Sequence, residues 1–439
     1  MKSEAPRIVA APPGPRSREL SARLSRVESP VFDARRQSRA EASGEEQAPI
    51  VYAEGAGSNV VDVDGNRYVD LTCGFGALAL GHSPAAVTRA ATAQASRLAL
   101  SLGDVYAAEP KIALCERLVA LYPEPGARVM LGLSGADALT AALKTCVLAT
   151  GKPGVVAFEG AYHGLSHGPL AACGYSEAFR APFAQQLGDH VRFVPYPGAG
   201  ADLDACKLHV TRALAAGGVG AVLVEPVLGR GGCVVPPPGF LAMLRAACDD
   251  VGALLVCDEV WTGLGRSGAI ARSLAEGVRA DVLCFGKSLG AGWPVSACVG
   301  SASAMAAWGA HGGTAIHTAT HFGAPPACAA ALAYLDVLAA ESLDARARTV
   351  GERWRDMLRI ATAGRGVKDV RGVGLMVGIE VDGGAARALA TTRRLLGAGW
   401  IVLTGGPRGD VLTLTPALNA PEELLHAFGL ALASALSAP

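Results

Sequence analysis

Two neighbouring stretches decide the fold: LLVCDEVWTGLGRSG at residues 254–268 and DVLCFGKSLG at residues 281–290. Each contains an unbroken apolar run, which is typical of a strand buried on both faces in a parallel sheet flanked by helices. The first run ends at Asp258 and the second is followed by Lys287. Because open α/β sheets bind ligands at the carboxyl ends of their strands, we expect this acid and this amine to lie at one site.

This pair of residues predicts a particular cofactor chemistry. Burial lowers the pKa of a lysine, and a partly neutral amine can attack a carbonyl to form a Schiff base. Pyridoxal phosphate requires such an amine, together with an acid that keeps its ring nitrogen protonated. The alternative is that Asp258 and Lys287 are solvated charges at strand ends. The apolar run before Asp258 favours the enzymatic interpretation, as does the absence of an acid close to Lys287 in sequence.

Composition excludes several other classes of function. Basic and acidic residues are balanced at 39 each, so there is no electrostatic footprint for nucleic acid or an anionic membrane. No apolar stretch approaches the roughly 20 residues of a membrane span, and the first twenty residues lack the apolar segment of a secretory signal. The eleven cysteines form no CxxC pair and lie mostly in apolar runs. This pattern predicts reduced core thiols in a cytoplasmic protein, without a metal site.

Strands and helices alternate from Arg128 onward, which predicts an α/β fold with a largely parallel sheet covered on both faces. Expected strands lie at 129–133, 155–158, 191–194 and 220–225, and expected helices at 136–148, 203–216 and 240–250. Four segments are expected: a disordered tail at 1–20, the first part of a small domain at 21–75, a large cofactor-binding domain at 76–341, and the remainder of the small α+β domain at 342–439.

Two loops in the large domain are candidates for cofactor binding. Ser134, Gly135 and Ala136 lead from a strand into a helix, whose first backbone N–H groups favour an anion such as a phosphate. The alternative there is an ordinary Ser-Gly cap. Tyr162 and His163 follow the next strand, where an aromatic ring can stack on a flat cofactor or serve packing alone.

Together these stretches resemble the class III aminotransferases, which are pyridoxal-phosphate enzymes of fold type I. The resemblance extends from about Val51 to the C-terminus. The blocks that carry it, in family order, are SGADALTAALK (134–144), YHG (162–164), VLVEPVLGRGG (222–232), LLVCDEVWTGLGRSG (254–268), FGKSLGAGWP (285–294) and HTATHFGAPPACAAALA (317–333).

The resemblance implies a role for each matching residue. Lys287 is the lysine that forms the Schiff base and shuttles the proton, and Asp258 is the partner of the pyridine nitrogen. Tyr162 and Val260 enclose the cofactor ring, Glu225 supports the site, and the N–H groups of Gly135 and Ala136 bind phosphate. Thr320 matches a threonine that reaches the phosphate from the partner subunit, so the resemblance also implies a homodimer with shared active sites.

Several positions depart from the family pattern. Trp261 stands where a glutamine is common, and His321 and Ala324 replace residues of the later motif. The arginine that grips an α-carboxylate in many members is Thr413 here, and the glutamate that pairs with that arginine is Arg230. The loss of both partners is coherent, because either one alone would be an unpaired charge. Arg230 then binds a substrate carboxylate through two guanidinium hydrogen bonds from the opposite side of the pocket. The alternative is that it is a solvent-facing arginine on a Gly-rich loop.

The predicted function is transfer of an amino group from an amine or amino acid to a keto or aldehyde acceptor. Isomerisation on the same fold is the main alternative, as an amino-acid racemase or a glutamate-semialdehyde type of aminomutase. The loop at 262–266, TGLGR, resembles the transaminase version and favours transfer over the mutase. A non-catalytic scaffold is a third alternative, and the presence of both Lys287 and Asp258 counts against it.

Overall fold

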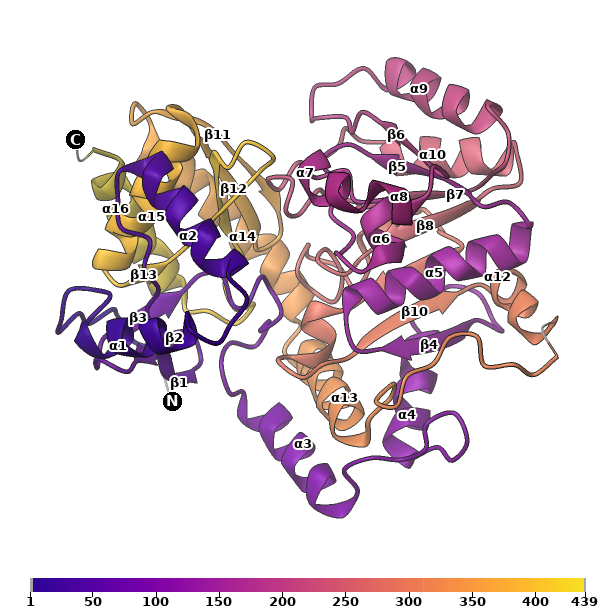
Figure 1. Cartoon of the computed structure of the whole chain (residues 1–439), viewed down its shortest axis with the longest axis horizontal. Coiled ribbons are helices and arrows are strands. Elements are labelled where there is room, and N and C mark those ends of the chain that lie inside the picture. The colour runs from indigo at the N-terminus through magenta and orange to yellow at the C-terminus, as the bar shows by residue number, and fades with distance from the viewer. Residues whose placement is uncertain (1–2, 311, 438–439) are drawn as a thin grey trace. The chain divides into compact units, whose positions relative to one another are not determined.

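The computed structural model of the chain describes residues 3–310 and 312–437. The chain divides into two compact units (Figure 1). The split unit comprises residues 1–84 and 346–439, and the central unit comprises residues 85–345. The sequence placed the corresponding boundaries after residues 75 and 341.

The central unit is built on a sheet with the strand order β4-β10-β9-β8-β7-β5-β6. Its strands are β4 (Arg128–Gly132), β5 (Gly154–Phe158), β6 (Val191–Val194), β7 (Val219–Val224), β8 (Leu254–Asp258), β9 (Val282–Phe285) and β10 (Ser296–Gly300). Neighbouring strands pair in parallel except at β10, which is antiparallel to both β4 and β9. Every residue of β5, β7, β9 and β10 is buried, which explains why these strands consist of apolar and small residues, with Ser296 of β10 as the one polar side chain.

Helices of the central unit cover this sheet (Figure 1). The longer ones are α3 (Ala85–Arg97), α4 (Glu109–Val119), α5 (Gly135–Thr150), α9 (Leu203–Ala215), α10 (Phe240–Asp249) and α13 (Pro325–Ala340). Short helical segments are α6 (His167–Ala171), α7 (Glu177–Arg180), η1 (Ala181–Phe183), α8 (Ala184–Leu187), α11 (Arg272–Ala275), η2 (Lys287–Gly290), α12 (Ala302–Ala306) and η3 (Ala307–Ala310). Helix α5 packs across β4, β10 and β9, which aims its N-terminus at the carboxyl ends of the strands.

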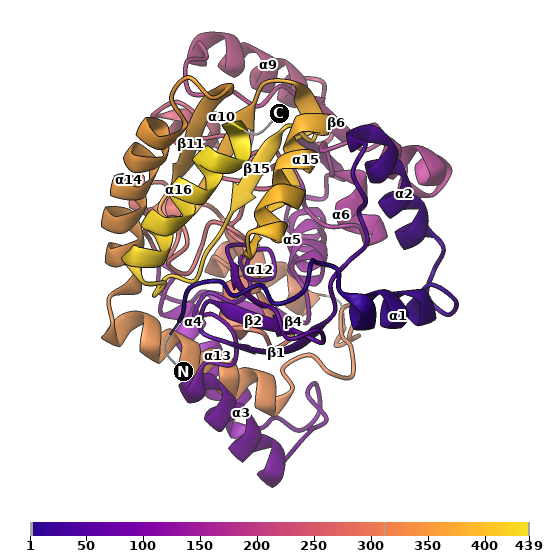
Figure 2. The same cartoon turned by 90° about the vertical axis from the view of Figure 1, so that its left-hand side faces the viewer.

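The split unit contains two four-stranded sheets, ordered β1-β2-β3-β13 and β11-β12-β15-β14. The strands are β1 (Tyr52–Ala56), β2 (Asn59–Asp62), β3 (Arg67–Asp70), β11 (Val367–Val373), β12 (Met376–Val381), β13 (Trp400–Ile401), β14 (Leu403–Gly405) and β15 (Val411–Leu414). The helices are α1 (Pro15–Leu24), α2 (Val31–Ser43), α14 (Leu343–Thr362), α15 (Gly384–Gly397) and α16 (Glu422–Ser437), and α14 begins three residues before the unit boundary. Figure 2 shows α15 and α16 side by side in front of the second sheet.

The N-terminal segment corrects one expectation, since residues 3–20 are ordered instead of forming a disordered tail; residues 1 and 2 of that tail lie outside the described residues. The backbones of Arg7 and Arg67 exchange two hydrogen bonds of 2.8 Å. Asp64 accepts hydrogen bonds from the N–H groups of Arg16 and Ser17 at the start of α1. A Pro- and Arg-rich composition predicts disorder, but acceptors some 50 residues away in sequence hold this segment in place.

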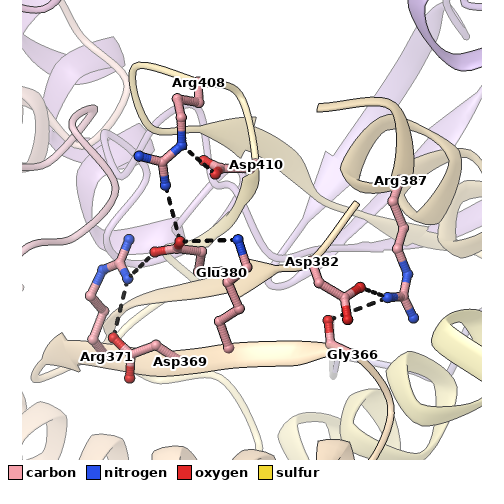
Figure 3. A network of polar contacts seen from close by, with 9 residues as sticks. Gly366, Asp369, Arg371, Glu380, Asp382, Arg387, Arg408 and Asp410 are labelled. Carbon is pink, nitrogen blue, oxygen red and sulfur yellow. Dashed lines mark hydrogen bonds and ion pairs between the residues drawn. The ribbon is translucent and has the colours of Figure 1, made fainter. Parts of the chain in front are cut away.

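A charged network links β11, β12 and the chain before β15 (Figure 3). Glu380 accepts hydrogen bonds from Arg371 at 2.7 Å and Arg408 at 3.1 Å, and Lys368 lies 3.9 Å away. Arg408 also donates to Asp410 at 2.8 Å. One glutamate thus faces three cations and ties three chain segments of the split unit together.

Among the described residues, no single helix is long and apolar enough to cross a membrane; α13 and α14 satisfy length and composition only as a bent pair. All eleven cysteines are free thiols, and no group of three or more potential metal ligands occurs in the described part of the chain.

Candidate active site

Asp258 ends β8, and both of its carboxylate oxygens are held. Oδ2 lies 2.7 Å from Nδ1 of His163, and Oδ1 accepts a 3.0 Å hydrogen bond from the N–H of Val260. Asp258 and His163 are both buried. The second ring nitrogen of His163, Nε2, has no hydrogen-bond partner among the described residues. His163 therefore orients Asp258, and the pair places a buried carboxylate at the carboxyl end of the sheet.

Glu225 follows β7 directly and forms the second buried acid of the site. Its Oε1 accepts a 2.7 Å hydrogen bond from the N–H of Tyr162, and its Oε2 accepts one of 3.0 Å from the N–H of Gly229. Burial, reinforced by the negative charge of Asp258, raises the pKa of Glu225 from 4.5 to about 7. Glu225 thus fixes two loops at the site and is partly protonated near neutral pH.

Lys287 lies two residues beyond β9 and opens the short helix η2. Its φ of +42° is in the left-handed region, which is strained for a residue with a side chain and recurs at functional sites. Burial lowers the pKa of Lys287, and Arg230 acts in the same direction against the attraction of Asp258 and Glu225. The amine is therefore more readily deprotonated than an exposed lysine, as nucleophilic attack on a carbonyl requires.

Trp261 closes one side of the site. The Lys287 ammonium nitrogen lies 4.5 Å from the centre of an indole ring. Trp261 is 8% exposed, and its indole N–H has no hydrogen-bond partner among the described residues. The ring also packs on Gly229, where a Cβ atom would lie 2.2 Å from Cε3 of the indole. Only glycine therefore fits at position 229 without rearrangement, and the indole ring of Trp261 could not occupy its position beside a larger residue.

Arg230 is held by a cage of three aromatic rings. Its guanidinium carbon lies 4.6 Å from the ring centre of Tyr162, 5.0 Å from that of Tyr175 and 5.6 Å from that of Phe179. Arg230 is partly buried, and within the described residues its guanidinium forms no hydrogen bond or ion pair. Stacking against aromatic faces fixes the plane of a guanidinium while its N–H edge remains available to a planar anion.

The N-terminus of α5 presents the predicted anion cradle. Asp137 accepts hydrogen bonds from the N–H groups of Leu133 and Ser134 at 3.0 Å each, and Ser134 accepts one from the N–H of Asp137. This capping box uses the Ser134 hydroxyl within the helix cap. In the described chain, no acceptor binds the N–H groups of Gly135 and Ala136. These two donors are available to an anion, and the helix dipole favours one there.

Glycines allow the cradle to pack closely on its neighbours. A Cβ on Gly135 would lie 2.8 Å from a methyl group of Val260, and one on Gly164 would lie 2.8 Å from the side chain of Ala136. Val260 is thereby brought against the start of α5, and Gly164, next to His163, against Ala136.

Two residues named from the sequence make none of the contacts described above. Thr320 is exposed, in a loop before α13, and forms no hydrogen bond within the described residues. Thr413 belongs to β15 of the split unit, where its buried hydroxyl has no hydrogen-bond partner in the described part of the chain. The structure therefore brings together the predicted site residues of the central unit, except Thr320.

Sequence reasoning missed the aromatic neighbours of two key residues. Tyr175 and Phe179 complete the cage of Arg230, and Trp261 faces the amine of Lys287. The tryptophan was visible as a departure from the family pattern, but its contact with the lysine was not. Tyr175 precedes the short helix α7 and Phe179 lies within it, so no periodic pattern in the sequence marked these two residues as neighbours.

The residues present fit pyridoxal phosphate. The two available N–H groups at the start of α5 suit its phosphate, and Asp258, set by His163, suits a protonated ring nitrogen. Lys287 provides an amine whose pKa burial lowers. The unpartnered buried N–H of Trp261 gives a further polar atom for a bound group.

Comparison with known proteins agrees with this geometry. Residues 40–436 match the family model of the class-III aminotransferases. Acetylornithine aminotransferase of Mycobacterium tuberculosis (strain H37Rv) is 41% identical over 393 residues, which cover 88% of this chain and 92% of that protein. Acetylornithine aminotransferase of Methanothermobacter thermautotrophicus is 34% identical, with 86% and 92% covered.

Solved structures show the same fold. An amine transaminase from an uncultivated Pseudomonas species, in its PLP-bound form, superposes with a TM-score of 0.80 at 30% identity, covering 89% of this chain and 94% of that chain. A thermostable omega transaminase mutant from Pseudomonas jessenii superposes with a TM-score of 0.83 at 25% identity, covering 88% and 92%.

Proposed function

The chain belongs to the class III aminotransferases, and we propose that the cluster around Lys287, Asp258 and Glu225 is its reaction centre. The protein is a pyridoxal-phosphate-dependent aminotransferase of fold type I. The match to relatives that bear transaminase names supports amino transfer over isomerisation. The observation that carries the assignment of the centre is the amine of Lys287, with its lowered pKa, at the sheet edge that also holds two buried acids.

Each residue of the cluster has a proposed task. When bound, pyridoxal phosphate supplies an electron-withdrawing ring that stabilises negative charge at the substrate carbon. Lys287 would hold the cofactor through its amine, and the same amine would carry the proton at that carbon. Asp258 keeps the ring nitrogen protonated, and His163 positions Asp258. Glu225 fixes the loops that carry Tyr162 and Gly229.

The remaining contacts hold the cofactor in place. Tyr162 and Val260 would hold its ring. The N–H groups of Gly135 and Ala136 bind its phosphate, and Ser134 shapes that loop through the capping box. In this proposal the cofactor contacts of one chain come from the central unit, and Thr320 would come from a partner subunit. We therefore propose that the working enzyme is a homodimer with shared sites.

An amino-donor screen tests the reaction. Purified, cofactor-loaded protein is mixed with single amino acids or amines, and conversion of the cofactor to its amine form is followed by absorbance. Amino transfer predicts this conversion, and its reversal on addition of a keto acid. Scrambled chirality of an amino acid without net exchange of the amino group would instead identify a racemase.

Arg230 is the proposed binding group for a substrate carboxylate. Its aromatic cage orients a guanidinium that has no carboxylate partner in the described chain. The charge of Arg230 acts on the pKa of Lys287, so the two side chains belong to one electrostatic site. A planar fork held in this way suits bidentate binding of a carboxylate. This geometry supports a ligand-binding role over that of an arginine facing solvent alone.

Substrates that differ in their carboxylate test this role. Arg230→Ala should raise the KM of a carboxylate-bearing donor such as acetylornithine by about 10-fold or more, the scale of a lost charge-assisted hydrogen bond. The KM of benzylamine should stay within about twofold, since no carboxylate is present. Arg230→Lys keeps the positive charge but cannot form two parallel hydrogen bonds to a carboxylate. Its KM for the carboxylate-bearing donor should therefore lie between those of wild type and Arg230→Ala. An equal change for both donors would place Arg230 outside substrate binding.

A further inference from the structure

The split unit contains a cavity of about 460 Å³ that is lined by arginines, which we call the arginine cavity. One wall is helix α2, from which Phe32, Arg35, Arg36 and Arg39 face the cavity. These positions recur at intervals of three and four residues, so they share one face of the helix. Arg393 of α15 adds a fourth guanidinium. The volume lies within the range of small-molecule sites.

The positive charges of this cavity are incompletely neutralised. Arg36 pairs with Asp33, but Arg35, Arg39 and Arg393 form no ion pair within the described residues. Burial lowers the pKa of Arg39, and the charges of Arg35 and Arg393 lower it further. No acidic residue lines the cavity. Arg39 and Arg393 are partly buried, whereas Arg35 is exposed. Like charges that are partly buried side by side are costly unless an anion compensates them.

The acids nearest to Arg393 do not remove this imbalance. Burial lowers the pKa of Arg393, and Glu46 and Glu45 oppose that effect through their charge. Glu46 is already engaged in an ion pair with Arg18. Arg393 itself donates a hydrogen bond of 3.2 Å to the carbonyl of Ala48, a neutral acceptor. The guanidinium charge of Arg393 therefore remains available to a ligand.

Apart from Gln47 and Thr392, mainly apolar side chains form the rest of the cavity. Phe32, Tyr52 and Phe75 are 44%, 49% and 56% exposed, although large apolar side chains are usually covered. Leu396 and Ile401 also line the cavity. No residue of α2 is fully buried, so the helix offers this face to a bound molecule at no cost in core packing. The lining therefore suits a ligand with both an anionic group and an apolar body.

We propose that the arginine cavity is a binding site for a small anion with an apolar body, a carboxylate or a phosphate on an aryl or alkyl group. Arg39 and Arg393 bind the anionic group through charge-assisted hydrogen bonds, and Arg35 adds a long-range attraction. The apolar body packs on Phe32 and Leu396. This site does not depend on the reaction assigned to Lys287, since all of its residues belong to the split unit.

Calorimetric titration of the cofactor-loaded protein with benzoate and phenyl phosphate tests the proposal. The titrations use an Arg230→Ala background, so that the proposed substrate carboxylate site is removed. One molecule of each anion should bind per chain, and the tighter of the two identifies the preferred anionic group. Benzyl alcohol, which lacks a negative charge and is not an amino donor, should bind at least about 10-fold more weakly.

Substitutions then locate the probe. Arg39→Gln and Arg393→Gln should each weaken anion binding by about 10-fold or more, and Arg39→Lys by less. Arg26→Gln is the matched control: Arg26 is exposed between α1 and α2, outside the cavity, and its loss should leave affinity unchanged. Equal melting temperatures of the variants exclude unfolding as the cause. The proposal is overturned if neither anion binds at millimolar concentration, if benzyl alcohol binds as tightly as the anions, or if all three Gln variants behave alike.

Discussion

Asp258 shows how a single residue is prepared for its task. His163 and the backbone of Val260 each hold one of its oxygens, so its orientation is fixed before any cofactor binds. Such preorganisation is more valuable than charge alone, because no rearrangement is needed during the reaction.

Replacing Asp258 by asparagine keeps its size and removes its charge. Asp258→Asn should retain the cofactor but lower kcat by about 10²–10³-fold, the loss typical when one electrostatic stabiliser is removed from an active site. Stopped-flow or steady-state amino transfer measures the effect. Asp249→Asn, at the exposed end of α10, is the control and should leave kcat unchanged. Near-normal turnover in Asp258→Asn would refute the proposed role.

Glu225 makes the stability of the protein depend on pH in a defined window. Its pKa is about 7 in the folded chain and 4.5 ordinarily, so between these values the folded state holds a proton that the unfolded state has released. The contribution of Glu225 to the free energy of unfolding is therefore complete below pH 4.5 and is lost as pH rises to about 7.

A glutamine at this position cannot titrate. The free energy of unfolding of wild type minus that of Glu225→Gln should therefore fall as pH rises from about 4.5 to 7. Above that range this difference should stay constant. Urea unfolding at several pH values measures it for both proteins. A difference that stays constant across the window would show that Glu225 does not titrate there.

At the level of single residues, the sequence predicted the reactive groups but not the side chains that contact them. Lys287 and Asp258 were found because apolar runs lead to each of them. The ring of Trp261 over Lys287 and the cage of Arg230 depend on side chains from separate loops, and spacing in sequence cannot show such contacts.

Helix α5 illustrates how an element positions a site. Its N-terminal loop is held by Asp137, which accepts three hydrogen bonds from Leu133 and Ser134, and the next two N–H groups remain available for an anion. The stability of this cap and the affinity for the cofactor phosphate are therefore coupled.

Removal of the cap should affect both properties. Asp137→Ala should lower the free energy of unfolding by about 1 kcal/mol and weaken cofactor binding by about 10-fold or more. Asp202→Ala is a matched control, because Asp202 caps α9 by accepting a hydrogen bond from the N–H of Asp204. That control should lose similar stability without a change in cofactor affinity, measured by equilibrium dialysis. Equal affinity losses in both variants would indicate a general effect of stability.

Among the elements, long apolar strands and capped helices were predictable, and long-range support was not. The mostly parallel sheet follows from apolar runs that alternate with helices. The antiparallel direction of β10 and the ordering of residues 3–20 depend on partners distant in sequence, such as Asp64 for α1. The residues of a segment do not indicate which distant residues will bind it.

For the whole molecule, the proposed dimer concerns Thr320. Its side chain is exposed in the single chain, as expected for a residue that completes a partner's site. If so, a mixed dimer of Thr320→Ala and Lys287→Ala subunits contains one site that carries neither change. Mixing the two inactive variants should therefore restore part of the activity, up to about one quarter of wild type with random exchange of subunits.

The matched control pairs two residues of one chain's site. A mixture of Lys287→Ala and Asp258→Asn leaves one change in each site, so its activity should remain at the level of the unmixed variants. Subunit exchange is verified independently by mass spectrometry of differently tagged chains. Absence of recovery with Thr320→Ala, despite proven exchange, would count against a shared site.

The most direct test of the central assignment is to locate the amine that holds the cofactor. Borohydride reduction of the cofactor-loaded enzyme, followed by proteolysis and mass spectrometry, identifies the modified lysine. The added mass is expected on the peptide that contains Lys287, and no covalent label is expected in Lys287→Ala. A label on any other lysine of the wild-type protein would contradict this assignment.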